Sequence, residues 1–413
     1  MYRILDRESL PGYLSEIPAV VEVLGDDPNP EILEIGDGNL NYVYRVTNPT
    51  DSTRSVIVKQ AVPYLRMVGE EWPLGRDRMT YEIRALQLYN ELVPDLVPTI
   101  YHADEEMSTL VMQFLDDHII MRLGMIDGVT YPNAAEHIGL FMAETLFRTS
   151  AWSMTSEDRR ALMDRFTMNA ELCKLTEEFI FTFPYMEHES NYSNPATDQW
   201  ARENIHTDSE YKRDVLACKD LFVAKTDALL HADLHSGSLM VNQSETYVID
   251  MEFAYFGPFG FDIGKIISNF LLCCTSHLHR SGGAEYRSWL IEQIEVIWTT
   301  FSARFDELWI ESGDSTMLID GLLTPEEFEA LRSDFMVGLL REAAGFAACS
   351  MARRTLGIAG VADIRDIEDL DVRSGLEIKN LMLSKRLMAA RNELSSIEEL
   401  LALVRSHFDS FTE

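Results

Sequence analysis

Alternating apolar and polar positions mark the first part of this chain as rich in β-structure. Helical spacing over about 80–92 predicts one helix there, and residues 5–25 predict a single short helix that ends near Gly25. Four further segments have the pattern of strands, namely 31–35, 42–46, 55–59 and 109–114. We therefore expect a small sheet with few helices in this part of the chain.

Helical spacing dominates from about residue 134 onward, and a long helical pattern covers about 325–352. Thr324-Pro-Glu-Glu327 places a capping threonine, a proline and a glutamate in front of that pattern, which predicts a helix start. Ser395-Ser-Ile-Glu398 is a second candidate capping box. The polar stretch 187–210 instead predicts a long loop within the helical part.

Together these patterns predict an α+β protein of two lobes. A chain of 413 residues is too long for one simple core. Residues 1–115 are expected to form a small β-rich N-terminal lobe, and residues 116–413 a larger helical C-terminal lobe. A ligand would then bind in the cleft between the two lobes.

The chain is strongly acidic, with 68 acidic and 35 basic residues and a formal net charge of −33. This charge argues against nucleic acid or an anionic membrane as a partner, because both select basic surfaces. The N-terminal sequence has no apolar signal core, and no segment approaches the ~20 apolar residues of a membrane span. The five cysteines lack metal-binding spacing, so we expect reduced thiols in a cytoplasmic protein.

Two acidic loops are the most informative feature of the sequence. Leu229-Leu-His-Ala-Asp-Leu-His-Ser-Gly-Ser-Leu-Met-Val241 places Asp233 in a polar loop after an apolar strand. Val248-Ile-Asp-Met-Glu-Phe-Ala254 places Asp250 and Glu252 after another. Such loops suit phosphoryl transfer, in which one carboxylate orients a hydroxyl nucleophile and others hold Mg²⁺ on the phosphates of a nucleotide.

His231 and His235 flank Asp233 and open an alternative. Alternate residues of an extended segment share one side, so the two histidines could ligate zinc. No further Cys or His lies at ligand spacing, which favours phosphoryl transfer.

Two features of the predicted sheet are candidates for phosphate binding. Gly36-Asp-Gly-Asn-Leu-Asn41 can be a plain hairpin turn or a loop whose backbone approaches phosphates closely. It is not a Walker A loop, because no G-x-x-x-x-G-K-[S/T] occurs in the chain. Lys59 ends an apolar strand and is either a solvated strand end or a phosphate-contacting lysine with Glu82 as its partner.

Arg353 and Arg354 follow the long helical pattern. Cations at a helix C-terminus are usually solvated and favourable to the helix dipole. In a chain this acidic they can also face a phosphoryl group or a hydroxylated substrate, and the sequence leaves both interpretations open. The glycines of Thr355-Leu-Gly-Ile-Ala-Gly360 favour a helix end there, which would let both side chains converge.

With these residues in place, the chain resembles the 5-methylthioribose kinase family, whose protein-kinase-like fold is shared with choline kinases and aminoglycoside phosphotransferases. The similarity extends from the first residues to about 390 and includes the Gly-rich turn and the arginine pair. Its other segments are Val58-Lys-Gln-Ala-Val-Pro-Tyr-Leu-Arg66, Glu71-Trp-Pro-Leu74, Leu230-His-Ala-Asp-Leu-His-Ser-Gly-Ser238, Asp250-Met-Glu-Phe-Ala-Tyr-Phe-Gly-Pro258 and Gly260-Phe-Asp-Ile-Gly264.

The resemblance implies ATP-dependent phosphorylation of S-methyl-5-thioribose at its anomeric hydroxyl, a step of methionine salvage, by a homodimer that uses Mg²⁺. It implies Asp233 as the catalytic and substrate-binding acid, Asp250 with Glu252 as metal ligands, and Arg353 with Arg354 as substrate ligands. The ATP-binding residues that it implies are Gly38, Asn39, Asn41, Lys59, Gln113, Phe114 and Leu115.

The chain departs from the family at Ala232 and Met251, where Gly and Pro are common, but the neighbouring acids are intact. Ser238 stands where protein kinases place a metal-binding Asn, although Ser is what methylthioribose kinases show. One competing hypothesis is a kinase of the same fold that acts on choline, homoserine or an aminoglycoside. Another is an inactive nucleotide-binding scaffold, against which the presence of Lys59, Asp233 and Asp250 argues.

Overall fold

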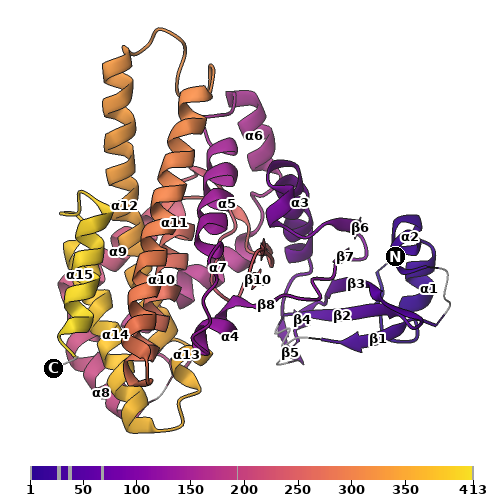
Figure 1. Ribbon diagram of the computed structural model, residues 1–413, viewed down its shortest axis with the longest axis horizontal. Helices are drawn as coiled ribbons and strands as arrows, with labels where there is room; N and C mark the ends of the chain where they lie inside the picture. Colours follow the sequence, from indigo (N-terminus) through magenta and orange to yellow (C-terminus); the bar gives the residue numbers. More distant parts are fainter. Residues whose placement is uncertain (1, 26–28, 36–39, 67–68, 193, 412–413) are drawn as a thin grey trace.

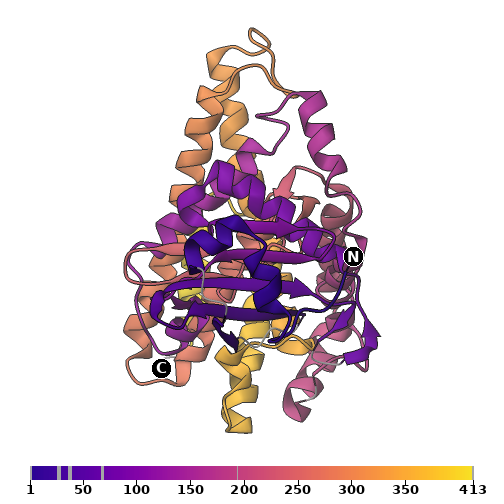
Figure 2. The ribbon, with the colours of Figure 1, turned by 90° about the vertical axis from the view of Figure 1, so that its right-hand side faces the viewer.

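The structure is a computed structural model that describes residues 2–25, 29–35, 40–66, 69–192 and 194–411. A sheet-containing N-terminal lobe lies beside a larger helical lobe (Figure 1). Figure 2 shows the N-terminal sheet in front of the helices. The predicted α+β class, with β-structure first and helices after it, is confirmed.

Five antiparallel strands form the N-terminal sheet in the order β1-β2-β3-β7-β6. These strands are β1 (Glu31–Glu34), β2 (Asn41–Asn48), β3 (Asp51–Ala61), β6 (Ile100–Asp104) and β7 (Thr109–Gln113). The four predicted strands are all present. The sequence analysis missed β6 and the separate pair of short strands, β4 (Tyr64–Leu65) and β5 (Gly69–Pro73).

Alternation along β3 sorts its side chains onto the two faces of the sheet. Val56 and Val58 pack in one apolar cluster with residues of α1 (Leu10–Ser15) and α2 (Pro18–Leu24). Lys59 therefore points to the opposite face, where it meets Glu82 of α3 (Asp77–Leu92). The pleat of the strand thus directs this lysine into the protein, and Lys59 is only 3% exposed.

Helices build the C-terminal lobe, and α11 and α12 rise together above the rest of it (Figure 1). The longer helices are α5 (Ala134–Arg148), α9 (Ser209–Ala224), α10 (Gly260–Ser276), α11 (Gly283–Glu311), α12 (Pro325–Leu356), α14 (Leu370–Ala390) and α15 (Ile397–Asp409). The shorter helices are α4 (Met121–Ile126), α6 (Ser156–Asp164), α7 (Ala170–Phe179), α8 (Pro195–Ala201) and α13 (Ala362–Arg365). Single turns are η1 (Pro94–Leu96), η2 (Phe183–Tyr185), η4 (His277–His279) and the π-helical η3 (Arg202–His206).

Short strands of the C-terminal lobe carry the two acidic loops. β9 (Ala228–Leu230) pairs with β12 (Tyr255–Gly257), and β10 (Leu239–Val241) pairs with β11 (Thr246–Val248) and β8 (Ile119–Ile120). Asp233 follows β9, whereas Asp250 and Glu252 lie between β11 and β12. Because β9 and β12 pair, the second loop ends beside the beginning of the first.

Helices α10 and α12 approach each other closely at Gly264. A Cβ atom added to Gly264 would lie 2.5 Å from the carbonyl oxygen of Ala343 and 2.8 Å from the amide nitrogen of Ala347. Only glycine fits between the two backbones at this distance. The close packing brings Lys265 of α10 within electrostatic range of Arg353 and Arg354 of α12.

Two predictions of secondary structure are wrong. A proline determines the local structure in one case, and contacts with a distant helix determine it in the other. Residues 5–25 form two helices, since Pro18 cannot continue α1 and instead begins α2. The stretch 187–210 is not a long loop, because α8, η3 and the start of α9 lie within it. Glu377 of α14 holds this region by accepting hydrogen bonds from Asn194 at 2.8 Å and Thr197 at 2.5 Å.

One of the two predicted capping boxes is confirmed. Thr324 Oγ1 accepts from the backbone N–H of Glu327 at 3.3 Å, and the Glu327 carboxylate accepts from the backbone N–H of Thr324 at 2.8 Å. The box at Ser395 is wrong, because α15 begins at Ile397 and the carboxylate of Glu399 accepts from the backbone N–H of Ser395.

Helix α12 is long and apolar enough to cross a membrane by length and composition, with a mean hydropathy of 1.3 over an 18-residue window. The expectation concerned an unbroken run of ~20 apolar residues, and Arg341 with Glu342 interrupts the apolar part of α12. Moreover, 67% of that window is buried inside the protein. The apolar character of α12 is that of a core helix packed against α10 and α14.

The cysteines carry free thiols, as predicted. Cys218, Cys273, Cys274 and Cys349 are buried, whereas Cys173 is partly exposed.

Candidate active site

The loop that carries Asp233 is fixed through its backbone. The amide N–H groups of His231 and Ala232 donate to the two carboxylate oxygens of Asp262 on α10, at 2.8 and 2.9 Å. Ala232 has a left-handed backbone with φ of 64°. That conformation is costly for any residue other than glycine. Ser238 closes the loop, since its hydroxyl accepts from the amide of His235 and lies 2.9 Å from the carbonyl of Asp233.

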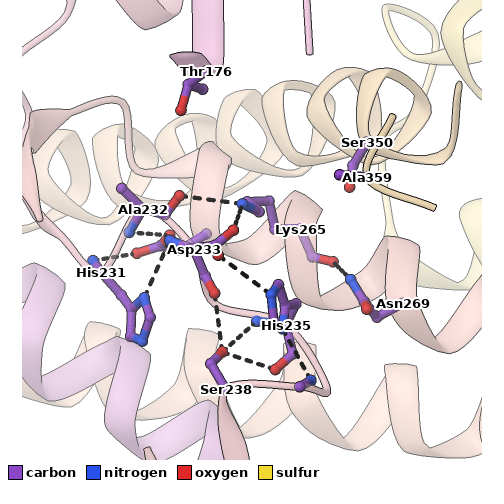
Figure 3. Close-up of polar contacts among 12 residues, drawn as sticks. Thr176, His231, Ala232, Asp233, His235, Ser238, Lys265, Asn269, Ser350 and Ala359 are labelled. Atoms are coloured by element: carbon purple, nitrogen blue, oxygen red, sulfur yellow. Dashed lines mark hydrogen bonds and ion pairs between the residues drawn. The ribbon is translucent and has the colours of Figure 1, made fainter. Parts of the chain in front are cut away.

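The side chain of Asp233 is partly buried, and its carboxylate lies among donors (Figure 3). Its Oδ1 forms an ion pair with Lys265, and its Oδ2 lies 3.3 Å from Nε2 of His235. Burial opposes ionisation of Asp233, but Lys265 and then His235 outweigh it and hold the pKa of this carboxyl well below its usual range. Asp233 is therefore an ionised carboxylate at neutral pH.

His235 contributes a neutral donor to Asp233. Its Nδ1 accepts from the amide of Gly237 at 2.9 Å, so Nε2 carries the ring proton and faces Asp233. Burial lowers the pKa of His235 to about 3. The ring therefore orients the carboxylate of Asp233 without supplying a charge.

His231 ties the two acidic loops together. Its Nδ1 accepts from the amide of Asp233 at 3.1 Å, and its Nε2 therefore donates to the carbonyl of Ile249 at 2.9 Å. Both ring nitrogens of His231 and of His235 are thus engaged in hydrogen bonds. The alternative of a zinc site at these two histidines is not supported.

Lys59 joins the sheet to the second acidic loop. Its ammonium lies 2.7 Å from Glu82, the partner predicted from the sequence, and 2.5 Å from Oδ1 of Asp250. Burial favours the neutral amine, but Asp250 and Glu82 outweigh it and raise the pKa of Lys59. Lys59 also lowers the pKa of Asp250 against the effect of burial. The interpretation of Lys59 as a solvated strand end is wrong.

Glu252 faces the N-terminal lobe. Asn41 donates to its Oε2 at 2.9 Å, and Arg78 lies 3.7 Å from the same oxygen. Arg78 is 2% exposed and also donates to the side chain of Asn41 at 3.1 Å. Burial raises the pKa of Glu252. The sequence analysis did not predict a site role for Arg78, because only the folded lobes bring it to Glu252.

The segment between the two lobes is anchored at each of its three predicted residues. The backbone N–H of Gln113 donates to the backbone carbonyl of Thr99 at 2.9 Å. The ring of Phe114 faces the guanidinium of Arg45 at 4.2 Å. Leu115 is buried. Gly38 and Asn39, the other predicted ATP-binding positions besides Asn41 and Lys59, lie outside the described residues.

Arg353 and Arg354 lie inside the last turn of α12, which continues to Leu356. The glycines after the pair end the helix, as expected, because Gly357 caps it. Both arginines are still helical, however, so their side chains leave the helix in different directions. Arg354 donates to the carbonyl of Ala359 at 3.1 Å, whereas Nε and Nη1 of Arg353 are buried and have no hydrogen-bond partner in the described part of the chain. Burial lowers the pKa of both groups, and Asp233 opposes this lowering. A solvated helix end does not describe this pair.

A group that could share a metal ion lies elsewhere in the described residues. Asp117, His118 and Glu245 offer ligand atoms within 4.8 Å of one another. Asp250 and Glu252 offer two carboxylates on the loop that His231 joins to the Asp233 loop. Hard oxygen donors of this kind fit Mg²⁺.

The arrangement suits transfer of an anionic group to a hydroxyl. Asp233 is an ionised acceptor for a proton, Lys59 and Arg353 are cations that can meet phosphate oxygens, and Asp250 with Glu252 can hold a divalent cation. Little covalent work is left for the protein in such a reaction, because positioning and charge are most of the catalyst.

Several known proteins are similar to this chain. The model of the phosphotransferase enzyme family matches residues 31–287. Methylthioribose kinase 1 of Oryza sativa subsp. japonica is 37% identical over 98% of this chain and 96% of its own length. Methylthioribose kinase of Bacillus cereus strain B4264 is 39% identical over 88% of each chain. A choline kinase structure from Cryptosporidium parvum Iowa II covers 97% of this chain and all of its own at 12% identity, with a TM-score of 0.48.

The left-handed backbone at Ala232 gives a stability prediction. Ala232→Gly should raise the free energy of unfolding by about 0.5–1 kcal/mol, because relief of the left-handed strain exceeds the extra chain entropy of glycine. Ala254→Gly is the matched control, since Ala254 is fully buried in the neighbouring loop without a positive φ, and it should lose about 1 kcal/mol. Urea unfolding measures both. An equal loss in the two variants would contradict the strain argument.

Proposed function

This chain belongs to the methylthioribose kinase family, and on that premise we propose which of its residues carry out the reaction. The enzyme transfers a phosphoryl group from ATP to the anomeric hydroxyl of S-methyl-5-thioribose, which gives S-methyl-5-thioribose 1-phosphate and ADP in methionine salvage. The observation that carries this conclusion is the similarity to named methylthioribose kinases over nearly the whole length of the chain.

Asp233 is proposed to accept the proton of the sugar hydroxyl. As the new bond between the hydroxyl oxygen and phosphorus forms, the bond from phosphorus to ADP breaks and the proton passes to the carboxylate. What supports this role is that Asp233 is ionised and still partly exposed, with donors on both oxygens that fix its orientation.

Lys59 and Arg353 are proposed to meet anionic oxygens from opposite lobes. Lys59 is kept charged by Glu82 and Asp250, and the phosphates of ATP would be the next anions to approach it. Arg353, with Arg354 beside it, would bind the sugar and its new phosphate through buried donors that have no partner in the described residues. The planar guanidinium of Arg353 is a rigid fork of donors, which suits both sugar hydroxyls and phosphate oxygens.

The remaining nucleotide contacts are proposed from position. Asn41 is the first residue of β2 and donates to Glu252. The adenine would lie at the anchored segment between the lobes, which contains Gln113, Phe114 and Leu115. Gly38 and Asn39 complete this proposed set through the family resemblance.

Mg²⁺ is proposed to be held by Asp250 and Glu252. Their described contacts with Lys59 and Asn41 engage one oxygen of each carboxylate, so a second oxygen of each can face a cation. The ion supplies neutralisation of charge on the phosphates of ATP when it is bound. A cation would also offset the burial that raises the pKa of Glu252.

A homodimer in solution, a cytoplasmic location, and the absence of nucleic-acid and membrane partners stay predictions.

Substrate choice is tested by ADP release with methylthioribose, choline, homoserine and kanamycin. We expect turnover with methylthioribose alone. Asp233→Asn should lower kcat for it by roughly 10²-fold or more, the usual contribution of a positioned acid–base group, while affinity for an ATP analogue stays nearly unchanged. A higher kcat/KM for any of the other three compounds would contradict the assigned substrate. Near-normal turnover of the variant would remove Asp233 from the mechanism.

The metal assignment predicts that Asp250→Asn and Glu252→Gln weaken Mg²⁺-dependent binding of a non-hydrolysable ATP analogue by roughly 10-fold or more, since even outer-sphere changes cost metal sites this much. Calorimetry with and without Mg²⁺ measures the effect. Glu245→Gln is the control, because Glu245 belongs to the separate group with Asp117 and His118. If only the Glu245 variant loses the metal dependence, the ion binds at that group instead.

A further inference from the structure

Lys265 is a buried lysine of α10 that the sequence analysis did not identify. Its side chain is 2% exposed, and its ammonium forms an ion pair with Oδ1 of Asp233. The carbonyl oxygen of Ala232 lies 3.2 Å from Nζ, and Figure 3 shows Lys265 reaching both residues from its helix. Burying an ammonium is costly unless it is paired and hydrogen-bonded, so this placement calls for an explanation.

Support of the loop does not by itself account for Lys265, which contacts one carbonyl of the loop, that of Ala232. Asp262 already accepts the two loop amides, and His231 binds the amide of Asp233. His235 orients the other carboxylate oxygen but is neutral, because burial lowers its pKa to about 3. Lys265 is thus the charged side chain that directly contacts Asp233 in the described part of the chain, and the charge of Asp233 depends on it.

The charges around this pair come from several elements. Arg353 and Arg354 of α12 repel the ammonium of Lys265, Asp262 of α10 and Asp233 attract it, and Arg122 of α4 lies near both Asp233 and His235. Burial lowers the pKa of Lys265 to about 8, with the two arginines adding to the effect and Asp233 opposing it. Lys265 can therefore lose its proton in mildly alkaline solution.

We propose that Lys265 is a positioning residue for phosphoryl transfer, whose ammonium keeps Asp233 ionised and holds its Oδ1 so that the carboxylate meets the substrate hydroxyl in one orientation. This inference rests on the proposed role of Asp233. The proton of the hydroxyl passes to Asp233 while the bond from phosphorus to ADP breaks. Lys265 stays an ammonium throughout and acts only through Asp233.

The pH dependence follows from the sign of each effect. Only protonated Lys265 attracts Asp233, so activity should be full below the pKa of about 8 and should fall as the pH rises through that value. Without the cation, burial would raise the pKa of Asp233. The acid side of the profile would then move to higher pH.

The test is the pH profile of kcat/KM for methylthioribose in Lys265→Arg and Lys265→Met. Arginine keeps its charge across this range, so the alkaline fall should move up by about one pH unit or more. Methionine removes the charge at similar volume, so kcat should drop by roughly 10²-fold, as for a misplaced catalytic group, and the acid limb should move up. Affinity for an ATP analogue should stay near that of the unsubstituted protein in both variants.

Lys225→Met is the matched control. Lys225 is also paired with a carboxylate, that of Glu342, but neither residue touches the Asp233 loop in the described contacts. Its pH profile should equal that of the unsubstituted protein. A structural role for any paired lysine would instead alter both methionine variants alike.

The inference is overturned if the alkaline limb stays in place in Lys265→Arg, or if Lys265→Met keeps normal kcat and pH profile. Should Lys265→Met fail to fold, as judged by its melting transition and analogue binding, the arginine variant decides alone. If the proposed function is wrong, the unsubstituted protein will not phosphorylate methylthioribose at any pH. The role of Lys265 is then overturned together with the proposed function. An active unsubstituted enzyme with unaffected variants overturns only the role of Lys265.

Discussion

Ionised groups that leave water need partners of opposite charge, and this constraint governs the region between the two lobes. The buried ammonium of Lys265 on α10 is matched by Asp233, and that of Lys59 on β3 by Asp250 and Glu82. Glu252 is matched by the amide of Asn41, with the guanidinium of Arg78 nearby. Each pair joins different elements, so the charge balance of the site also ties the sheet to the helical lobe.

The backbone is arranged so that these partners can meet. Left-handed conformations turn the chain at Ala232, directly before Asp233, and at Asp250 itself. Asp262 accepts the amides of the first loop, and His231 connects that loop to the second. Gly264 then lets α10 and α12 approach closely enough for the arginines of one helix to face the lysine of the other. The strain at the turns is thus compensated by hydrogen bonds and packing from elsewhere in the lobe.

Local patterns predicted much of the fold, because alternation and helix capping act over a few residues. They located four strands of the sheet, the helix start at Thr324, Lys59 with Glu82, and the two acidic loops. They could not find Lys265, which lies in an apolar helix 32 residues after Asp233 and becomes informative only when the ion pair is seen. The stretch 187–210 was misjudged for the same reason, since its helices are held by the distant Glu377.

The central claim is that buried cations of the helical lobe face Asp233 to receive the sugar and its new phosphate. Steady-state kinetics of Arg353→Ala and Arg354→Ala test it most directly, with the KM values for methylthioribose and ATP measured separately. Arg353 has two buried nitrogens without a described partner, whereas Arg354 has one and already donates to Ala359, so the larger loss is predicted for Arg353. In Arg353→Ala, kcat/KM for the sugar should fall by roughly 10²-fold or more, with little change in KM for ATP. Normal sugar kinetics in both variants, with only a small loss of stability, would contradict it.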